Sequence, residues 1–138
     1  MNIAIINGPN LNLLGKREPE IYGMQTFEDY FQKLQQEYPA ITFSYFQSNV
    51  EGELINQLQQ LDQKVHGIIL NPGGYTHTSV AIGDTIAAMS TKVVEVHISN
   101  IFSREEFRKL SHVSAKAKGV ISGLGLRGYE LALQYFIY

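Results

Sequence analysis

The stretch VHGIILNPGGYTHTS, residues 65–79, places a short apolar run directly before a turn-rich polar segment. Residues 65–70 are mainly apolar with β-branched side chains, which favours a buried strand. A strand that is apolar on both faces is typical of a parallel sheet covered by helices on each side. The polar residues that follow such a strand are therefore the first place to look for a site.

Outward from this stretch, the chain alternates between strand-like and helix-like segments. The helix-like segments have an apolar spacing near 3.6 residues, and Thr26 and Ser103 each precede an acidic residue by three positions, a capping-box pattern that predicts a helix start. The alternation predicts an α/β fold, a flavodoxin-like three-layer sandwich with a five-stranded parallel sheet. The other predicted strands are residues 2–6, 41–46, 92–99 and 119–124. One predicted helical stripe consists of Leu54, Ile55, Leu58 and Leu61.

Length and composition narrow the class of protein. The chain has 138 residues and 44% of them are hydrophobic, which predicts a single domain, residues 1–138, with a core of ordinary size. We expect this one domain to be catalytic. The net charge of −2 offers no basic surface for nucleic acid. Without cysteine, the chain has no disulfide or thiolate chemistry. The N-terminus lacks a signal-peptide pattern and no window resembles a membrane span, so we expect a cytoplasmic protein without membrane association.

Polar residues follow three of the five predicted strands. They are residues 7–10, 71–79 and 97–100. In an open parallel sheet the ligand binds beyond the carboxyl ends of the strands, at the point where the strand order reverses. These three segments are therefore predicted to meet at one edge of the sheet and to form the site.

The segment after the third strand has two interpretations. Asn71-Pro72-Gly73-Gly74 is also a simple turn sequence. His77, however, directly precedes a predicted helix capped by Thr78 or Ser79. Backbone N–H groups at such a helix start can hold an anion or an oxygen-rich ligand.

Glu95 and His97 are two residues apart in the fourth predicted strand and therefore point to the same face. A carboxylate beside an imidazole fixes its tautomer and favours its charged form, which prepares a general acid. The alternatives are a polar pair that closes the strand, and a metal site built from His77 and His97 with Asp84 or Glu95. The short HxxxH or HExxH spacing typical of a metal site is missing, so no metal is predicted.

Residues 8–23 form an unusually long connection between a strand and a helix, and they contain Arg17 and Tyr22. An arginine close to a tyrosine favours the phenolate, which would make the tyrosine a base. A loop of this kind can close over a crevice and exclude water. An ordinary surface loop is the alternative.

Arg104 and Arg108 are four residues apart on the predicted helix after the fourth strand and would share a face. One of them can grip a carboxylate through two parallel hydrogen bonds. The alternative is a solvated helix face, on which Glu105 and Lys109 form a solvent-facing pair.

Four stretches together resemble the signature sequences of type II 3-dehydroquinate dehydratase: GPNLNLLGKREPEIYG (8–23), NPGGYTHTSVAIGD (71–84), EVHISNIFSREEFR (95–108) and GVISGLGLRGYELAL (119–133). The resemblance implies a flavodoxin-like subunit without cofactor, assembled as a dodecamer of four trimers. It also implies dehydration of 3-dehydroquinate to 3-dehydroshikimate through an enolate, in the shikimate route to aromatic compounds.

The resemblance carries roles to particular residues. Tyr22 corresponds to the base, Arg17 to the residue that activates it, and Asn10 to the residue that holds a water on the enolate oxygen. His97 corresponds to the general acid, with Glu95 as its partner. Asp84 corresponds to a residue that reaches the neighbouring subunit's site. The positions that match substrate-binding residues are Asn71, His77, Ile98, Ser99 and Arg108, the last in preference to Arg104.

Two features depart from the family pattern. Gly83 stands where we expect an arginine or another larger side chain, and residues 110–119, LSHVSAKAKG, look less typical. We expect both to affect subunit contacts and neither to touch a catalytic position. Residues 129–138 are apolar or aromatic nearly all round, which predicts either a subunit contact or a helix packed fully on its own sheet.

Three other functions were weighed against this one. A flavin or nucleotide module needs a first loop rich in Gly, Ser and Thr, whereas GPNLNLLG has two asparagines and three leucines. A phosphoacceptor receiver needs acidic residues at the first strand end, and residues 1–17 contain none. An inactive relative is disfavoured because the proposed catalytic residues are all present.

Overall fold

The computed structural model describes residues 1–16, 20 and 24–138 and contains a five-stranded sheet whose neighbouring strands are all parallel. The strand order is β2-β1-β3-β4-β5, the flavodoxin-like order, which confirms the predicted α/β class. Each predicted strand end lies within two residues of the observed end. The strands are β1 (Asn2–Asn7), β2 (Thr42–Gln47), β3 (Gly67–Asn71), β4 (Val93–His97) and β5 (Gly119–Ser122).

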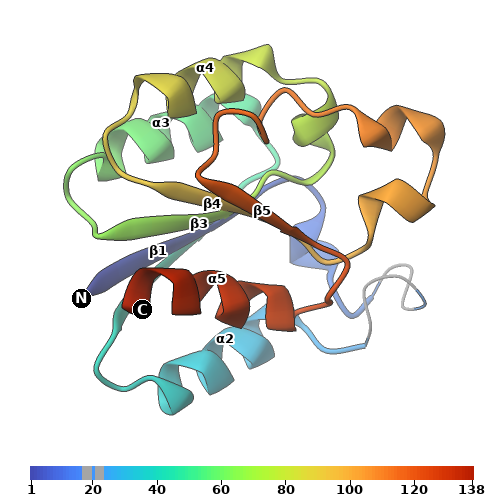
Figure 1. Cartoon of the computed structure of the whole chain (residues 1–138). Coiled ribbons are helices and arrows are strands. Elements are labelled where there is room, and N and C mark those ends of the chain that lie inside the picture. The colour runs from blue at the N-terminus through green and yellow to red at the C-terminus, as the bar shows by residue number, and fades with distance from the viewer. Residues whose placement is uncertain (17–19, 21–23) are drawn as a thin grey trace.

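Helices cover both faces of the sheet and complete three layers (Figure 1). Helices α2 (Phe27–Glu37) and α5 (Arg127–Ile137) lie on one face. Helices α3 (Glu51–Leu61) and α4 (Val80–Ala88) lie on the other. Within the described residues, no helix is both long and apolar enough to cross a membrane.

Two apolar clusters, one on each face, hold the layers together. Alternate residues of β1 point to opposite faces, as strand geometry requires. Ile3 and Ile5 join the cluster under α2 and α5, while Ala4 and Ile6 join the cluster under α3 and α4. The stripe predicted for α3 is confirmed, because Leu54 and Leu58 are fully buried and Ile55 and Leu61 pack against the same cluster.

One predicted helix start is confirmed and the other is wrong. The Thr26 side chain accepts a hydrogen bond from the Asp29 N–H at 3.2 Å, and α2 begins at Phe27, directly after Thr26. Ser103 instead donates to the Asn100 carbonyl at 2.9 Å, so its hydroxyl does not cap a helix. The chain after β4 forms two short 3-10 turns, η3 (Ile101–Ser103) and η4 (Glu106–Lys109), in place of the predicted α-helix.

Helix α5 packs mainly on its own sheet. Tyr129, Ala132 and Leu133 are fully buried, while Tyr135 and Tyr138 are exposed. The packing alternative therefore accounts for most of the apolar character of this segment.

Candidate active site

The carboxyl ends of β1, β3 and β4 form the edge at which the predicted polar segments meet. The strand order reverses between β1 and β3, and the loops after these two strands are in contact. The Gly8 N–H donates to the Asn71 carbonyl at 2.7 Å. A Cβ at Gly8 would come within 2.6 Å of the Pro72 carbonyl oxygen, so only glycine allows this approach.

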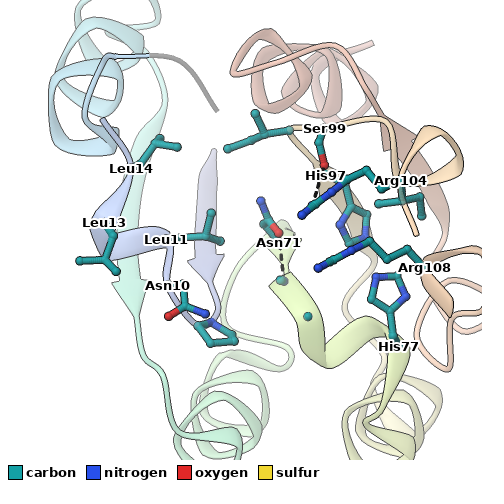
Figure 2. A pocket seen from close by; sticks show the side chains of 15 residues that line it. Asn10, Leu11, Leu13, Leu14, Asn71, His77, His97, Ser99, Arg104 and Arg108 are labelled. Carbon is teal, nitrogen blue, oxygen red and sulfur yellow. Dashed lines mark hydrogen bonds between the residues drawn. The ribbon is translucent and has the colours of Figure 1, made fainter. Parts of the chain in front are cut away.

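A pocket opens at this edge, and most of the predicted site residues line it (Figure 2). The loops after β1, β3 and β4 all contribute to it, together with η4. The predicted residues that line the pocket are Asn10, Asn71, His77, His97, Ile98, Ser99 and Arg108.

Of the other four predicted site residues, Glu95 and Asp84 are described by the structure but do not line the pocket. Glu95 is fully buried directly behind His97. Asp84 is exposed on α4 and is not part of its own chain's pocket. Arg17 and Tyr22 lie outside the residues that the structure describes.

His97 and Glu95 form a buried pair at the end of β4. The His97 Nε2 lies 2.5 Å from the Glu95 Oε2, which confirms that the two side chains share a face. Because the carboxylate can only accept, Nε2 carries a hydrogen, and Nδ1 is the nitrogen left for a bound molecule. Only 5% of His97 is exposed, so the pair is shielded from bulk water.

Hydrogen bonds hold the Glu95 carboxylate in its charged form. Thr76 Oγ1 donates to Oε2 and Ser114 Oγ donates to Oε1, each at 2.6 Å. Burial raises the pKa of Glu95, but the hydrogen bonds from His97, Ser114 and Thr76 outweigh it, and the net pKa lies below the ordinary value.

His77 presents the opposite kind of histidine to the pocket. Its Nδ1 lies 2.7 Å from the Leu110 carbonyl oxygen, so Nδ1 carries the hydrogen and Nε2 is free to accept. Burial lowers the pKa of His77, and the positive charges of His97 and Arg108 lower it further. The two imidazoles are nearly parallel, with centroids 6.5 Å apart. One side of the pocket therefore has a neutral acceptor beside a carboxylate-paired donor.

The segment Leu110–Ser114 contacts two predicted site residues, one of them the predicted catalytic residue Glu95, so the expectation that residues 110–119 touch no such position is wrong. Leu110 binds His77 and Ser114 binds Glu95. Gly83 belongs to the same arrangement, because a Cβ there would collide with the His112 carbonyl oxygen. The missing side chain at position 83 thus allows α4 to pack against this segment within the chain.

Arg104 and Arg108 both line the pocket, although the helix predicted to align them is absent. Arg108 Nε donates to Glu105 at 3.0 Å, and Arg104 donates to the Ser99 hydroxyl at 3.2 Å. The predicted pair of Glu105 with Lys109 is wrong, since Lys109 contacts Glu106 instead. Two guanidinium groups beside two imidazoles make this side of the pocket suitable for an anionic ligand.

A buried network supports the floor of the pocket. Asn71 donates to the Tyr129 hydroxyl at 3.0 Å, and that hydroxyl donates to Asn7 Oδ1 at 2.7 Å. Burial raises the pKa of Tyr129, and it raises the pKa of Tyr45, which contacts Asn7, to about 12. These two tyrosines are therefore poor bases at neutral pH.

The rival metal site finds no support in this geometry. In the part of the chain that the structure describes, no group of three or more His, Asp or Glu side chains is arranged to hold a metal ion.

Comparison with known proteins decides the family. A sequence model of the family "Dehydroquinase class II" matches residues 1–137. The chain belongs to this family.

Relatives and solved structures agree with the class II dehydroquinase assignment. A 3-dehydroquinate dehydratase of Actinobacillus pleuropneumoniae serotype 5b is 53% identical over 98% of this chain and 89% of its own. That of Polynucleobacter asymbioticus is 55% identical over 96% of this chain and 91% of its own. The crystal structure of type II dehydroquinase from Butyrivibrio crossotus covers 100% of this chain and 98% of its own, with 42% identity and a TM-score of 0.96.

Several residues in or behind the pocket of this class II dehydroquinase were not singled out from the sequence. The sequence shows Arg104 four residues before Arg108, but only Arg108 was predicted to bind substrate. Thr76 and Ser114 gave no signal, because a hydroxyl has no distinctive pattern and their contact with Glu95 depends on three separate segments. Of the other lining residues, Pro9, Gly73 and Gly74 lie within the predicted segments 7–10 and 71–79, whereas Leu11, Leu13, Leu14 and Ile101 lie outside them.

Proposed function

We propose that the pocket at the ends of β1, β3 and β4 binds 3-dehydroquinate and dehydrates it to 3-dehydroshikimate, as a hydro-lyase of the shikimate pathway. The single observation that carries this function is the buried His97–Glu95 pair facing a pocket lined by two arginines. The substrate carries a carboxylate, a ketone and a hydroxyl group that must leave as water. The arginines can bind the carboxylate, and His97 can protonate the hydroxyl group as it leaves.

The first step removes a proton from the carbon next to the substrate ketone. Tyr22 is the proposed base, and Arg17 stabilises its phenolate. The raised pKa values of Tyr45 and Tyr129 support the choice of a tyrosine other than these two. The electron pair of the broken C–H bond becomes the enolate, whose oxygen is stabilised by a water held on Asn10.

The second step expels the hydroxyl group. The enolate collapses to restore the ketone, a carbon–carbon double bond forms, and the C–O bond to the hydroxyl breaks. His97 donates its proton from Nδ1 to the departing oxygen, so that water leaves. The Glu95 carboxylate supports this role, since it accepts from Nε2 and leaves Nδ1 available to the departing oxygen.

The remaining predicted residues are proposed to bind substrate. Arg108 and the backbone of Ile98 and Ser99 lie on the cationic side, which favours a carboxylate there. Neutral His77 accepts a hydrogen bond from a substrate hydroxyl through Nε2, which its bond to Leu110 leaves available. Asn71 completes the floor. No cofactor is required by these steps.

We also propose that residues 1–138 act as one catalytic domain within a cytoplasmic dodecamer of four trimers. Asp84 is exposed and points outside its own chain's pocket, which is compatible with a contribution to a neighbouring site. Exposed apolar side chains at Phe102 and Leu110, 60% and 61% exposed, offer surface for such contacts. Sedimentation velocity tests the assembly, and a monomer that turns over substrate normally would contradict it.

A direct assay tests the function. Purified protein is mixed with 3-dehydroquinate and the conjugated enone of the product is followed by ultraviolet absorbance. A rise in absorbance that scales with protein concentration supports the proposal. A flavin or nucleotide module would give no rise.

A further inference from the structure

We propose that Thr76 and Ser114 are positioning residues for the general acid, because together they hold the Glu95 carboxylate that orients His97. This inference rests on the proposed function, in which His97 protonates the leaving group. Neither hydroxyl is among the residues that line the pocket. Both act through Glu95, each from a different segment of the chain.

The direction of each hydrogen bond follows from the donors available. Ser111 Oγ accepts from the N–H groups of Val113 and Ser114, both at 3.0 Å, so its own hydrogen is free to donate. Thr76 Oγ1 lies 2.6 Å from Ser111 Oγ and 2.6 Å from Glu95 Oε2. A carboxylate only accepts, so Thr76 donates to Glu95 and accepts from Ser111.

The carboxylate is thereby held at both oxygens. Thr76 and His97 donate to Oε2, and Ser114 donates to Oε1. Two fixed donors set the plane of the carboxylate, and that plane sets the orientation of the His97 ring. They also lower the basicity of Glu95, so that the proton on Nε2 stays on the imidazole while the proton on Nδ1 passes to the substrate.

The segment that carries Ser114 also positions the second histidine. Leu110 accepts from His77, and the His112 N–H donates to the Thr76 carbonyl at 2.8 Å. A displacement of this segment therefore moves the partners of both imidazoles together. The segment Leu110–Ser114 therefore supports both histidines, although it is distant in sequence from His77 and Glu95.

The structure brings several other charged or titratable side chains to this corner, among them His112 on the segment that carries Ser114. Within the described residues, His97 lies on the same strand as Glu95, His77 lies on η2 (Gly73–His77), and Arg104 and Arg108 come from the turns after β4. Arginine keeps its charge throughout the accessible pH range. A shift in the acid limb of the kcat profile after removal of a Glu95 donor is therefore assigned to the Glu95–His97 pair. The variant His77→Gln tests whether His77 causes the shift instead.

The test compares Ser114→Ala and Thr76→Val with the conservative variants Ser114→Thr and Thr76→Ser. Thr85→Val is the matched control, because the buried Thr85 hydroxyl donates only to the Ala81 carbonyl on α4. We expect kcat to fall about 10-fold in each variant that loses a hydroxyl, with KM within about 2-fold, and to recover in the conservative variants. If one variant fails to fold, the other decides.

The pH profile separates positioning from plain stability. Removal of a donor raises the pKa of Glu95, so the acid limb of the kcat profile moves to higher pH. A drop in activity without a shift of this limb, or a drop matched by Thr85→Val, overturns the proposal.

A second measurement does not depend on turnover. Glu95 has a lowered pKa in the folded protein. Its contribution to the free energy of unfolding is therefore present at pH values above its unfolded-state pKa of about 4.3, and it is lost as the pH falls. The Tm of Ser114→Ala should therefore lie below the wild-type Tm at pH 7.5, and the difference should shrink towards pH ~3.5. An unchanged difference overturns the inference even if the wild type proves inactive on 3-dehydroquinate, which would refute the proposed function alone.

Discussion

The Nδ1 of His77 lies 2.7 Å from the carbonyl oxygen of Leu110, thirty-three residues further along the chain. This contact decides which nitrogen of the imidazole carries the hydrogen and leaves Nε2 as an acceptor towards the pocket. It also connects η2 to a segment that sequence reasoning had assigned to the subunit surface. Several expected effects of substitution follow from such long-range contacts.

His77→Ala should weaken substrate binding more than it slows the chemical step. It removes the neutral acceptor, and a buried hydrogen bond of this kind corresponds to a KM increase of about 10-fold. Steady-state kinetics measures both constants. His66→Ala is the control, since the exposed His66 only accepts from the Asn2 N–H. Equal kinetics for the two variants would remove His77 from the binding site.

Glu95→Gln should lower kcat by about 100-fold, the lower end of general acid–base contributions. The amide is similar in size but carries no charge, and its NH₂ group would face one of the three groups that donate to Glu95 in the wild type. KM should stay within a few-fold. A kcat within about 3-fold of the wild type would mean that the carboxylate is not needed.

The same variant has an expected effect on stability against pH. The lowered pKa of Glu95 means that its contribution to the free energy of unfolding is present above pH ~4.3 and is lost as the pH falls through the folded value. Thermal unfolding between pH 7 and pH 3 should therefore show a steeper acid loss for the wild type than for Glu95→Gln. Parallel curves would count against an ionised Glu95.

Gly83→Ala should destabilise the protein although alanine is the better helix former. The new Cβ would collide with the His112 carbonyl, and overpacking typically costs about 1–3 kcal/mol, against a gain of about 1 kcal/mol in helix propensity. Chemical denaturation measures the difference.

Gly52→Ala on α3 is the matched control for that experiment. A Cβ at Gly52 meets nothing within 4 Å, so this change should raise the free energy of unfolding by about 0.5–1 kcal/mol. If both substitutions change the free energy of unfolding by the same amount, the packing of α4 against His112 is not the reason for glycine at position 83.

The sheet and the pocket-lining loops were predictable because their signals are local. Apolar runs of five or six residues identify parallel strands, and the strand ends then place Asn10, Asn71 and His97 at one edge. The period-two spacing was enough to pair Glu95 with His97. Such inferences need only neighbours in sequence and the known geometry of a strand.

The contacts beyond that edge were not predictable in this way. The turn after β4 was expected to be a helix, but Ser103 bonds back to Asn100 and the chain forms 3-10 turns instead. The hydroxyl groups of Thr76 and Ser114 bind Glu95 from separate segments, and no periodicity in the sequence links these three residues. Gly83 was interpreted as a surface feature because its neighbour, His112, is distant in sequence.

Tyr22→Phe tests the proposed base, which lies outside the described residues. Loss of the phenolic oxygen should lower kcat by at least about 100-fold, since no proton can be taken from the substrate carbon. Tyr75→Phe serves as a control, because the Tyr75 hydroxyl donates to the Asn49 carbonyl and does not line the pocket. Near-normal turnover of Tyr22→Phe would assign the base to another group.

The most direct test of the central claim is the progress curve of enone absorbance after 3-dehydroquinate is added to wild type and to His97→Ala at equal concentration. Chelator and borohydride are present, and the fold of both proteins is checked by circular dichroism. The account predicts a steady rise for the wild type and a rate at least about 100-fold lower for His97→Ala. A folded wild type that gives no rise, or equal rates for the two proteins, would contradict dehydration at this pocket.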